Sequence, residues 1–139
     1  VLTKRPERMR EYILDRKRKG WKPDWNNIWL GVTVEDQARA DERIWRLLQI
    51  PAAVHFVSVE PMLGPVDLTK RRWFLENKYA GKEYARLDWV IVGQETGPGA
   101  RPAKAEWFFS IIEQCNEAGV PVFIKQAPSG VAIIREFPK

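Results

Sequence analysis

Residues that could do chemistry gather at the end of one short apolar stretch, within the sequence DWVIVGQETGPGARP from Asp88 to Pro102. Its apolar residues 89–92 predict a buried strand, which is followed by Gly93, Glu95, a glycine-rich turn and Arg101. A buried parallel strand that delivers a carboxylate, a glycine loop and a cation to one edge is one way for an α/β domain to build a polar site. The stretch also fits a plain connection from a strand to a helix, with charges that serve solubility.

The same pattern recurs at two earlier stretches, IWLGVTVE at 28–35 and VHFVSVE at 54–60. Because side chains alternate across a strand, the residues of each strand fall into two sets. One set is almost purely aliphatic, which is typical of a face that packs against helices. The other set ends in a hydroxyl or glycine followed by a glutamate, and these pairs are Thr33 and Glu35, Ser58 and Glu60, and Gly93 and Glu95.

A sheet with one aliphatic face and one face that becomes polar at the carboxyl ends of its strands is expected for a barrel or half-barrel. A doubly wound sheet, covered by helices on both faces, would instead have two aliphatic sets. We therefore predict an α/β fold of alternating β-α units with a parallel sheet. Part of a (β/α) TIM-type barrel is favoured over a Rossmann-like sheet.

Alternating hydrophobic patterns predict five strands and three helices in a single domain, residues 1–139. The strands fall near 1–3, 28–34, 54–59, 89–92 and 122–125, and the helices near 6–19, 37–48 and 102–118. Residues 69–86 are expected to form a polar excursion with a short helix around Trp73, Phe74 and Tyr79. Residues 127–139 are expected to form a tail in which 131–134 is a candidate strand. The start at Val1, without Met, suggests the C-terminal part of a longer barrel.

The carboxyl ends of barrel strands form the active site, so this reasoning places carboxylates and cations on one rim. The cations expected there are Lys4, Arg5, Arg101 and Lys125, next to the three glutamates. Such a mixture fits a small polar molecule that carries both charges. It also fits ion pairing among the side chains themselves, and no residue is assigned a catalytic role.

Composition narrows the remaining classes of function. The 139 residues are 45% hydrophobic and 29% charged, as in one globular domain. No apolar run approaches the roughly 20 residues of a membrane span, so no membrane partner is predicted. A single cysteine, Cys115, is compatible with a cytoplasmic location. Cys115 and the single histidine, His55, both lie in apolar patterns, so we expect them to be buried and predict no metal site.

Positive charge is concentrated at the start of the chain. The net charge is +5, and residues 1–25 hold nine Lys/Arg against four Asp/Glu. A basic first helix can follow a phosphate backbone, so a non-catalytic nucleic-acid-binding module is the alternative hypothesis. A solvated helix face is the ordinary explanation of such a run. A structural remnant without independent activity is the third reading.

Five motifs together resemble one protein family. They are LTKRP (2–6), IWLGVTVEDQ (28–37), FVSVEPMLGPVDL (56–68), DWVIVGQETGPGARP (88–102) and VPVFIKQ (120–126). In order and spacing they are similar to an uncharacterised phage-associated family whose members look like radical S-adenosylmethionine proteins. The likeness runs from residue 1 to about residue 126, and we expect no counterpart for 69–86 or for the tail.

The resemblance implies a cofactor and a division of roles. S-adenosylmethionine would be bound by strand-end residues, here Thr33, Glu35, Ser58, Glu60, Gly93 and Glu95. Substrate would be bound by Lys4, Arg5, Arg101 and Lys125. The family's iron–sulfur cluster is held by cysteines in an N-terminal segment that this sequence lacks, so only a longer form would hold one. Family members tend to have two glycines where this chain has Gly93 and Gln94.

Overall fold

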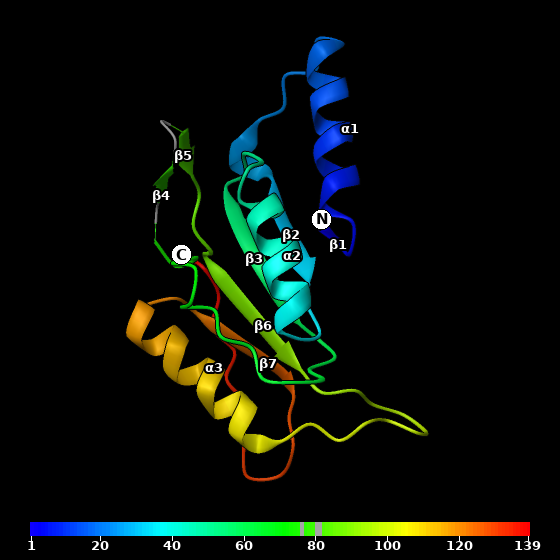
Figure 1. Ribbon diagram of the computed structural model, residues 1–139, viewed down its shortest axis with the longest axis vertical. Helices are drawn as coiled ribbons and strands as arrows, with labels where there is room; N and C mark the ends of the chain where they lie inside the picture. The colour runs from blue at the N-terminus through cyan, green and yellow to red at the C-terminus, as the bar shows by residue number, and fades with distance from the viewer. Residues whose placement is uncertain (76, 80–81) are drawn as a thin grey trace.

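Five parallel strands form the central sheet of this computed structural model, which describes residues 1–75, 77–79 and 82–139. The strands and the three α-helices alternate along the chain, except that no α-helix lies between β3 and β6, as Figure 1 shows. In order they are β1 (Leu2–Thr3), α1 (Pro6–Arg18), β2 (Trp29–Thr33), α2 (Gln37–Leu47), β3 (Val54–Val59), β6 (Trp89–Gly93), α3 (Ala105–Ala118) and β7 (Val122–Gln126). A 3-10 turn, η1 (Trp25–Asn27), precedes β2. The predicted α/β class with parallel strands is confirmed.

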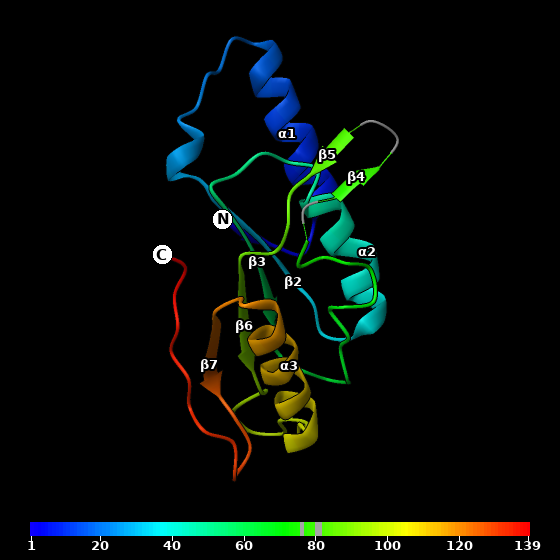
Figure 2. The ribbon, with the colours of Figure 1, turned by 90° about the vertical axis from the view of Figure 1, so that its left-hand side faces the viewer.

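Strand order in the sheet follows the order of the chain, β1-β2-β3-β6-β7, without a reversal. The aliphatic row predicted for each strand is buried against the helices, where it forms one core with residues of α1, α2 and α3. Ile13, Ile44 and Phe108 represent the three helices in this core. Figure 2 shows α2 and α3 on one side of the sheet and the C-terminal tail on the other.

The opposite side of the sheet carries an aromatic face, made of Trp29, Phe56, Trp89, Phe123 and Phe137. Trp89 is its centre, with ring centroids 5.3 Å from Phe137, 5.7 Å from Phe56, 6.0 Å from Trp29 and 6.1 Å from Phe123. The indole Nε1 of Trp89 donates to the Glu136 carbonyl oxygen at 2.8 Å, which fixes the tail over this face. Geometry of this kind adds about 0.5–1.5 kcal/mol per aromatic pair to the area that each ring buries.

Gly31 explains how the ring of Phe56 fits on this face. A Cβ atom on Gly31 would lie 2.4 Å from the Phe56 ring, far inside contact distance. Gly31 and Phe56 are register partners in β2 and β3, so the ring fills the space that the glycine leaves. The absence of a side chain in one strand is therefore a packing requirement of its neighbour.

Two peripheral segments differ from the sequence predictions. The predicted helix around Trp73, Phe74 and Tyr79 is wrong, because Tyr79 lies in β4 (Asn77–Tyr79), which pairs antiparallel with β5 (Lys82–Tyr84). Trp73 and Phe74 are buried in the turns that precede this hairpin. In the tail, residues 131–134 form no strand, and a single antiparallel bridge joins Phe123 to Arg135. The tail nonetheless follows β7 and covers that edge of the sheet.

We expect Ile111→Ala to lower the free energy of unfolding by about 2–5 kcal/mol, because Ile111 is fully buried and the smaller side chain leaves a cavity. Phe109→Ala, two residues earlier on α3, is the control, since Phe109 is 51% exposed and its loss should change stability by only about 0.5 kcal/mol. Urea denaturation of both variants measures the difference. Equal effects would show that α3 does not pack as described.

Candidate functional site

At the carboxyl edge of the sheet, Glu60 connects three strands. It follows β3, its carboxyl group lies over Gly93 of β6, and its Oε2 accepts a hydrogen bond from the Lys125 Nζ of β7 at 2.9 Å. The side chain of Glu60 is 25% exposed and that of Lys125 is 50% exposed, so solvent reaches both charges. The sequence predicted all three residues as site residues, and the structure brings them together.

Two hydroxyl side chains lie below this ion pair on the same side of the sheet. Thr33 and Ser58 are register partners, and both are buried. Because side chains alternate, they share their face with Gly31 and Phe56, and the aromatic rings come before them along the strands. From the amino to the carboxyl end, this face thus runs from aromatic rings to hydroxyls and then to the charged pair.

Glu35 is committed to a different contact. Its carboxylate accepts hydrogen bonds from Lys4 and, at 3.0 Å, from Arg43 of α2. Arg43 also donates to the Thr33 carbonyl oxygen at 2.7 Å. Both Glu35 and Arg43 are about nine-tenths buried in their side chains, at 13% and 12% exposed. This group joins the ends of β1 and β2 to α2, so its clearest role is structural.

Sequence reasoning missed Arg43, although a signal was present. α2 buries Ala40, Ile44 and Leu47 against the sheet, and Arg43 directly precedes Ile44. A cation on the buried stripe of a helix needs a partner there, and the carboxyl end of β2 supplies one.

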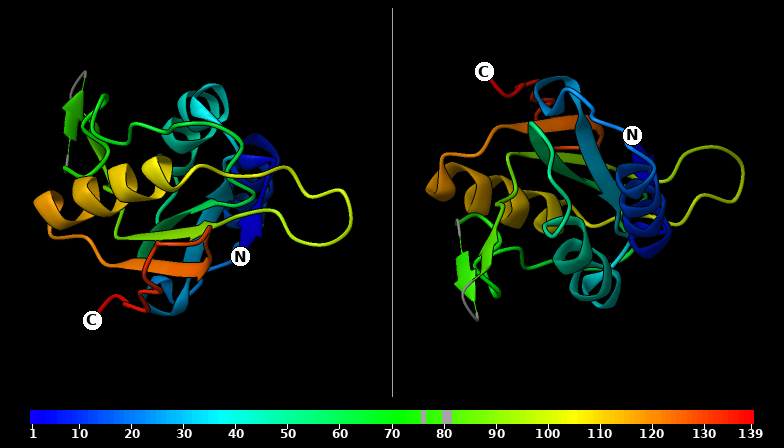
Figure 3. Two further views of the ribbon diagram at one scale, coloured as in Figure 1. Left: turned by 90° about the horizontal axis from the view of Figure 1, so that it is seen from below. Right: turned by 90° about the horizontal axis from the view of Figure 1, so that it is seen from above.

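Glu95 and Arg101 form a clamp within a single loop. Both carboxylate oxygens of Glu95 accept from the Arg101 guanidinium, at 2.8 and 2.7 Å, and the Arg101 backbone N–H also donates to Glu95 at 2.8 Å. Between them, residues 96–100 project away from the sheet, as Figure 3 shows. Gly97 and Gly99 have positive φ angles of 97° and 76°, which only glycine adopts without strain.

The three predicted glutamates are therefore held by three separate sets of cations. Arg5, at the start of α1, is exposed and forms no ion pair with the residues that the structure describes. Gln94 takes a structural contact, because its side-chain amide donates to the Ala127 carbonyl oxygen at 3.1 Å and its backbone N–H donates to Gln126. Gln94 thus ties the start of the tail to the end of β6.

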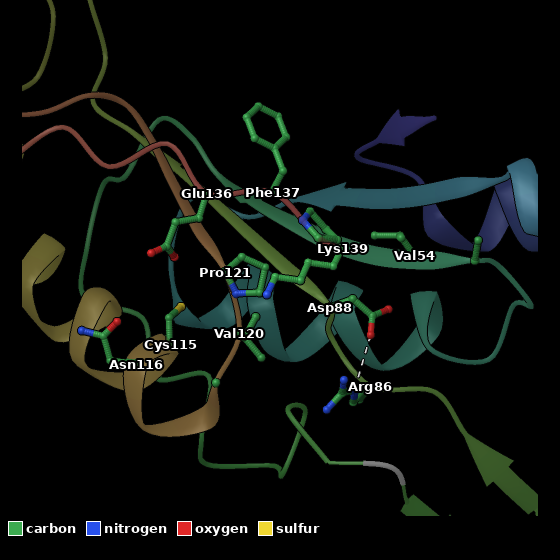
Figure 4. Close-up of a pocket in the computed structure, with 13 residues that line it drawn as sticks. Val54, Arg86, Asp88, Cys115, Asn116, Val120, Pro121, Glu136, Phe137 and Lys139 are labelled. Carbon is green, nitrogen blue, oxygen red and sulfur yellow. Dashed lines mark ion pairs between the residues drawn. The ribbon is translucent and has the colours of Figure 1, made fainter.

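A cavity of about 800 Å³ lies at the other edge of the sheet, where the strands begin. Figure 4 shows its lining, which includes the Arg86–Asp88 ion pair and the C-terminal residues Glu136 and Lys139. The two carboxylates already serve the sheet, since Asp88 accepts from the His55 backbone N–H at 2.9 Å and Glu136 from that of Val122 at 3.0 Å. Sequence reasoning did not predict this cavity, because no motif marks it.

His55 and Cys115 are both buried, as predicted. The His55 Nε2 lies 2.6 Å from the Ile50 carbonyl oxygen, and burial lowers the pKa of this imidazole. Burial, and secondarily the charge of Glu136, raises the pKa of the Cys115 thiol to about 12, so it remains protonated at neutral pH. Neither residue is placed to act as a base or nucleophile.

Two further findings concern the part of the chain that the structure describes. Its residues contain no group of three or more His, Cys, Asp or Glu side chains that could hold a metal ion. None of its helices has the length and apolar character needed to cross a bilayer.

Gly93→Ala should destabilise the protein by about 1 kcal/mol, at the low end of overpacking costs, because the new Cβ would lie 2.9 Å from the Glu60 carboxyl group and would push this partly exposed side chain away from Lys125. Gly64→Ala is the matched control, since the nearest atom to its Cβ would be 3.9 Å away. Urea denaturation measures both variants. A Gly93→Ala protein as stable as the Gly64→Ala protein would mean that Glu60 is not held tightly over β6.

The clamp predicts an unusual titration of Glu95. Hydrogen bonds from the Arg101 side chain, and then from its backbone, lower the pKa of this carboxyl from 4.5 to about 2. Because the folded-state pKa is depressed, the clamp contributes its full stability above pH 4.5 and loses it as the pH falls toward 2. NMR titration of the carboxyl carbon should report this pKa, and Arg101→Gln should raise it toward 4.5. Lys104→Gln, a nearby change of equal charge, should leave it unchanged, and an equal shift in both variants would contradict the clamp.

Comparison with known proteins gives a match to one protein-family model. No curated protein and no solved structure matches this sequence. The family match covers residues 1–133, and its range spans both residues 69–86 and the start of the tail, for which no counterpart was expected. Association with phages and likeness to radical S-adenosylmethionine proteins stay predictions. With a match over nearly its whole length, the chain belongs to the family described as "Protein of unknown function (DUF5131)".

Proposed function

We propose that this domain is an arc of a (β/α) barrel of the radical S-adenosylmethionine type, and that its rim binds a small molecule carrying both an ammonium and a carboxylate. The observation that carries the proposal is the solvent-accessible Glu60–Lys125 pair above Gly93, where three neighbouring strands end. S-adenosylmethionine, with its amino-acid end, is the ligand that we favour.

The strand order supports a barrel arc. In a doubly wound sheet the strand order reverses, and helices then cover both faces. Here the order never reverses, and all three helices contribute to one core. The opposite face would then line the lumen of the barrel. The aromatic rings would fill the lumen near the amino ends of the strands, and Thr33 and Ser58 would form the next layer toward the carboxyl ends.

An internal ion pair is a suitable receptor for an amino-acid group. An exposed pair of this kind is worth only about 0–1 kcal/mol, so separating its two charges costs little. A ligand that inserts its ammonium next to Glu60 and its carboxylate next to Lys125 replaces one ion pair with two. Glu35 and Glu95 are less available, because each already bonds a guanidinium.

The chain cannot hold an iron–sulfur cluster by itself. Such clusters are bound by several cysteine thiolates. Cys115 is the single cysteine of the sequence, and it is fully buried in α3. The proposal therefore concerns ligand binding at the rim and includes no radical step.

The test is NMR titration of the labelled protein with S-adenosylhomocysteine, a stable analogue that keeps the amino-acid end. We expect shifts of the Glu60, Gly93 and Lys125 amide signals. Glu60→Gln should weaken binding about tenfold or more, because a hydrogen bond to a charged group contributes about 1.5–3 kcal/mol. Glu113→Gln, on the exposed surface of α3, is the charge-matched control and should bind like the unmodified protein.

Two outcomes would overturn the proposal. In one, the ligand causes no shifts at the rim. In the other, the shifts cluster around Arg86 and Asp88, which would assign ligand binding to the cavity at the opposite edge.

A further inference from the structure

We propose that α1 and the loop that follows it bind single-stranded nucleic acid. Nine of the 23 Lys/Arg residues, but only four of the 18 Asp/Glu residues, lie between positions 1 and 25. The excess of positive charge in this segment equals the net charge of the whole chain, +5. Such a local excess is what a polyanion recognises, through the counterions that it releases on binding.

Much of this charge is free to meet phosphates. The C-terminal half of α1 extends beyond the sheet, as Figure 1 shows, and residues 16–22 are all exposed. Arg10, Arg18 and Lys22 form no ion pair with the residues that the structure describes. Within the helix, Lys19 pairs with Asp15, and Arg8 lies 3.7 Å from Glu11, both as exposed contacts that a phosphate can displace at little cost.

Aromatic rings lie among these cations. The Arg16 guanidinium carbon lies 5.6 Å from the centre of the Tyr12 ring, and the Lys17 Nζ lies 5.6 Å from that of Trp25. Trp21 meets Trp25 edge to face at 6.0 Å. We name Tyr12, Arg16, Lys17, Trp21 and Trp25 the cationic–aromatic surface.

This combination favours a single strand over a duplex. Bases can stack on protein rings only when they are not stacked in a helix, and single-strand binding proteins join such rings to a basic track for the backbone. Tyr12 is 51% exposed and Trp21 is 38% exposed, so both rings have free surface for a base. Arg16, next to Tyr12, and Lys17, next to the Trp25 that Trp21 contacts, would meet the phosphates of the stacked nucleotides.

An anionic membrane fits the surface less well. A helix that lies in a membrane interface inserts a continuous apolar face. In α1, Met9 and Ile13 instead pack into the protein core, and Leu14, at 38% exposed, leaves no continuous apolar face. Tyr12 is 51% exposed and is therefore available for stacking.

The surface is also separate from the rim. The amino end of α1 follows β1, at the carboxyl edge of the sheet, and η1 precedes β2, at the amino edge. The charges at the C-terminal end of α1, and the two tryptophans that follow it, therefore lie away from Glu60 and Lys125. Either site can fail its test while the other passes.

Fluorescence anisotropy with a labelled oligothymidylate of about 20 nucleotides tests the proposal, at salt concentrations from about 50 to 200 mM. We expect binding that weakens with salt. The double variant Arg10→Gln/Arg18→Gln should reduce the slope of log K against log salt by about 1.4, because each lost phosphate contact on a single strand removes about 0.7. The double variant Lys70→Gln/Arg135→Gln removes the same charge elsewhere on the exposed surface and should leave the slope unchanged.

Stacking is tested separately from charge. Trp21→Ala should weaken binding about fivefold or more with no change in the salt slope, since stacking on an aromatic side chain does not involve counterions. The Trp21 side chain is partly exposed, so the variant should fold, and circular dichroism checks this.

Several results would overturn the proposal. These are the absence of oligothymidylate binding, equal losses in the two double variants, and tighter binding to a duplex of the same length. Preferential binding to vesicles of phosphatidylcholine and phosphatidylserine would assign the surface to membranes instead.

Discussion

The three α-helices that connect the parallel strands all pack against the same face of the sheet. Connections between parallel strands are right-handed, so a strand order that never reverses places every helix on one face. The strands must then supply an aliphatic row to that face, and Val32, Val57 and Val90 show its completeness, each with no exposed surface. The other face is released from helix packing. Aromatic rings, hydroxyls and finally charges can occupy it, which is why a polar site is possible there at all.

This constraint explains how much of the fold could be predicted. An alternation of period two locates buried parallel strands and separates their faces, because it reflects contacts that every residue of the strand makes. The excursion at 69–86 and the tail at 127–139 lie outside the parallel strands of the sheet, so this pattern could not predict their structure. Tyr12 has the spacing of a buried residue next to Ile13, but Ile13 is buried in the core whereas Tyr12 is 51% exposed.

The candidate site was predictable in its position but not in its pairings. Their positions after the strands place Glu35, Glu60 and Glu95 at one edge of the sheet. The alternation of side chains along each strand predicts the same environment for all three. Their partners differ greatly in sequence separation, from 6 residues for Arg101 to 65 for Lys125. A local partner turns a carboxylate into a loop clamp, whereas a distant one joins strands across the sheet. Only three-dimensional contacts decide which of these happens, and Arg43 shows that a partner can come from a helix that no motif marks.

The Glu95–Arg101 clamp has a consequence for how this family can vary. Three hydrogen bonds between Glu95 and Arg101 hold the two ends of the projecting loop together, so a change in the loop need not move the strands. Lengthening a loop whose ends are already held adds only a slowly growing entropic cost. The tip around Pro98 can therefore accept inserted residues without disturbing the strands. A tether of this kind gives the fold a position where new sequence can be gained while its core stays the same.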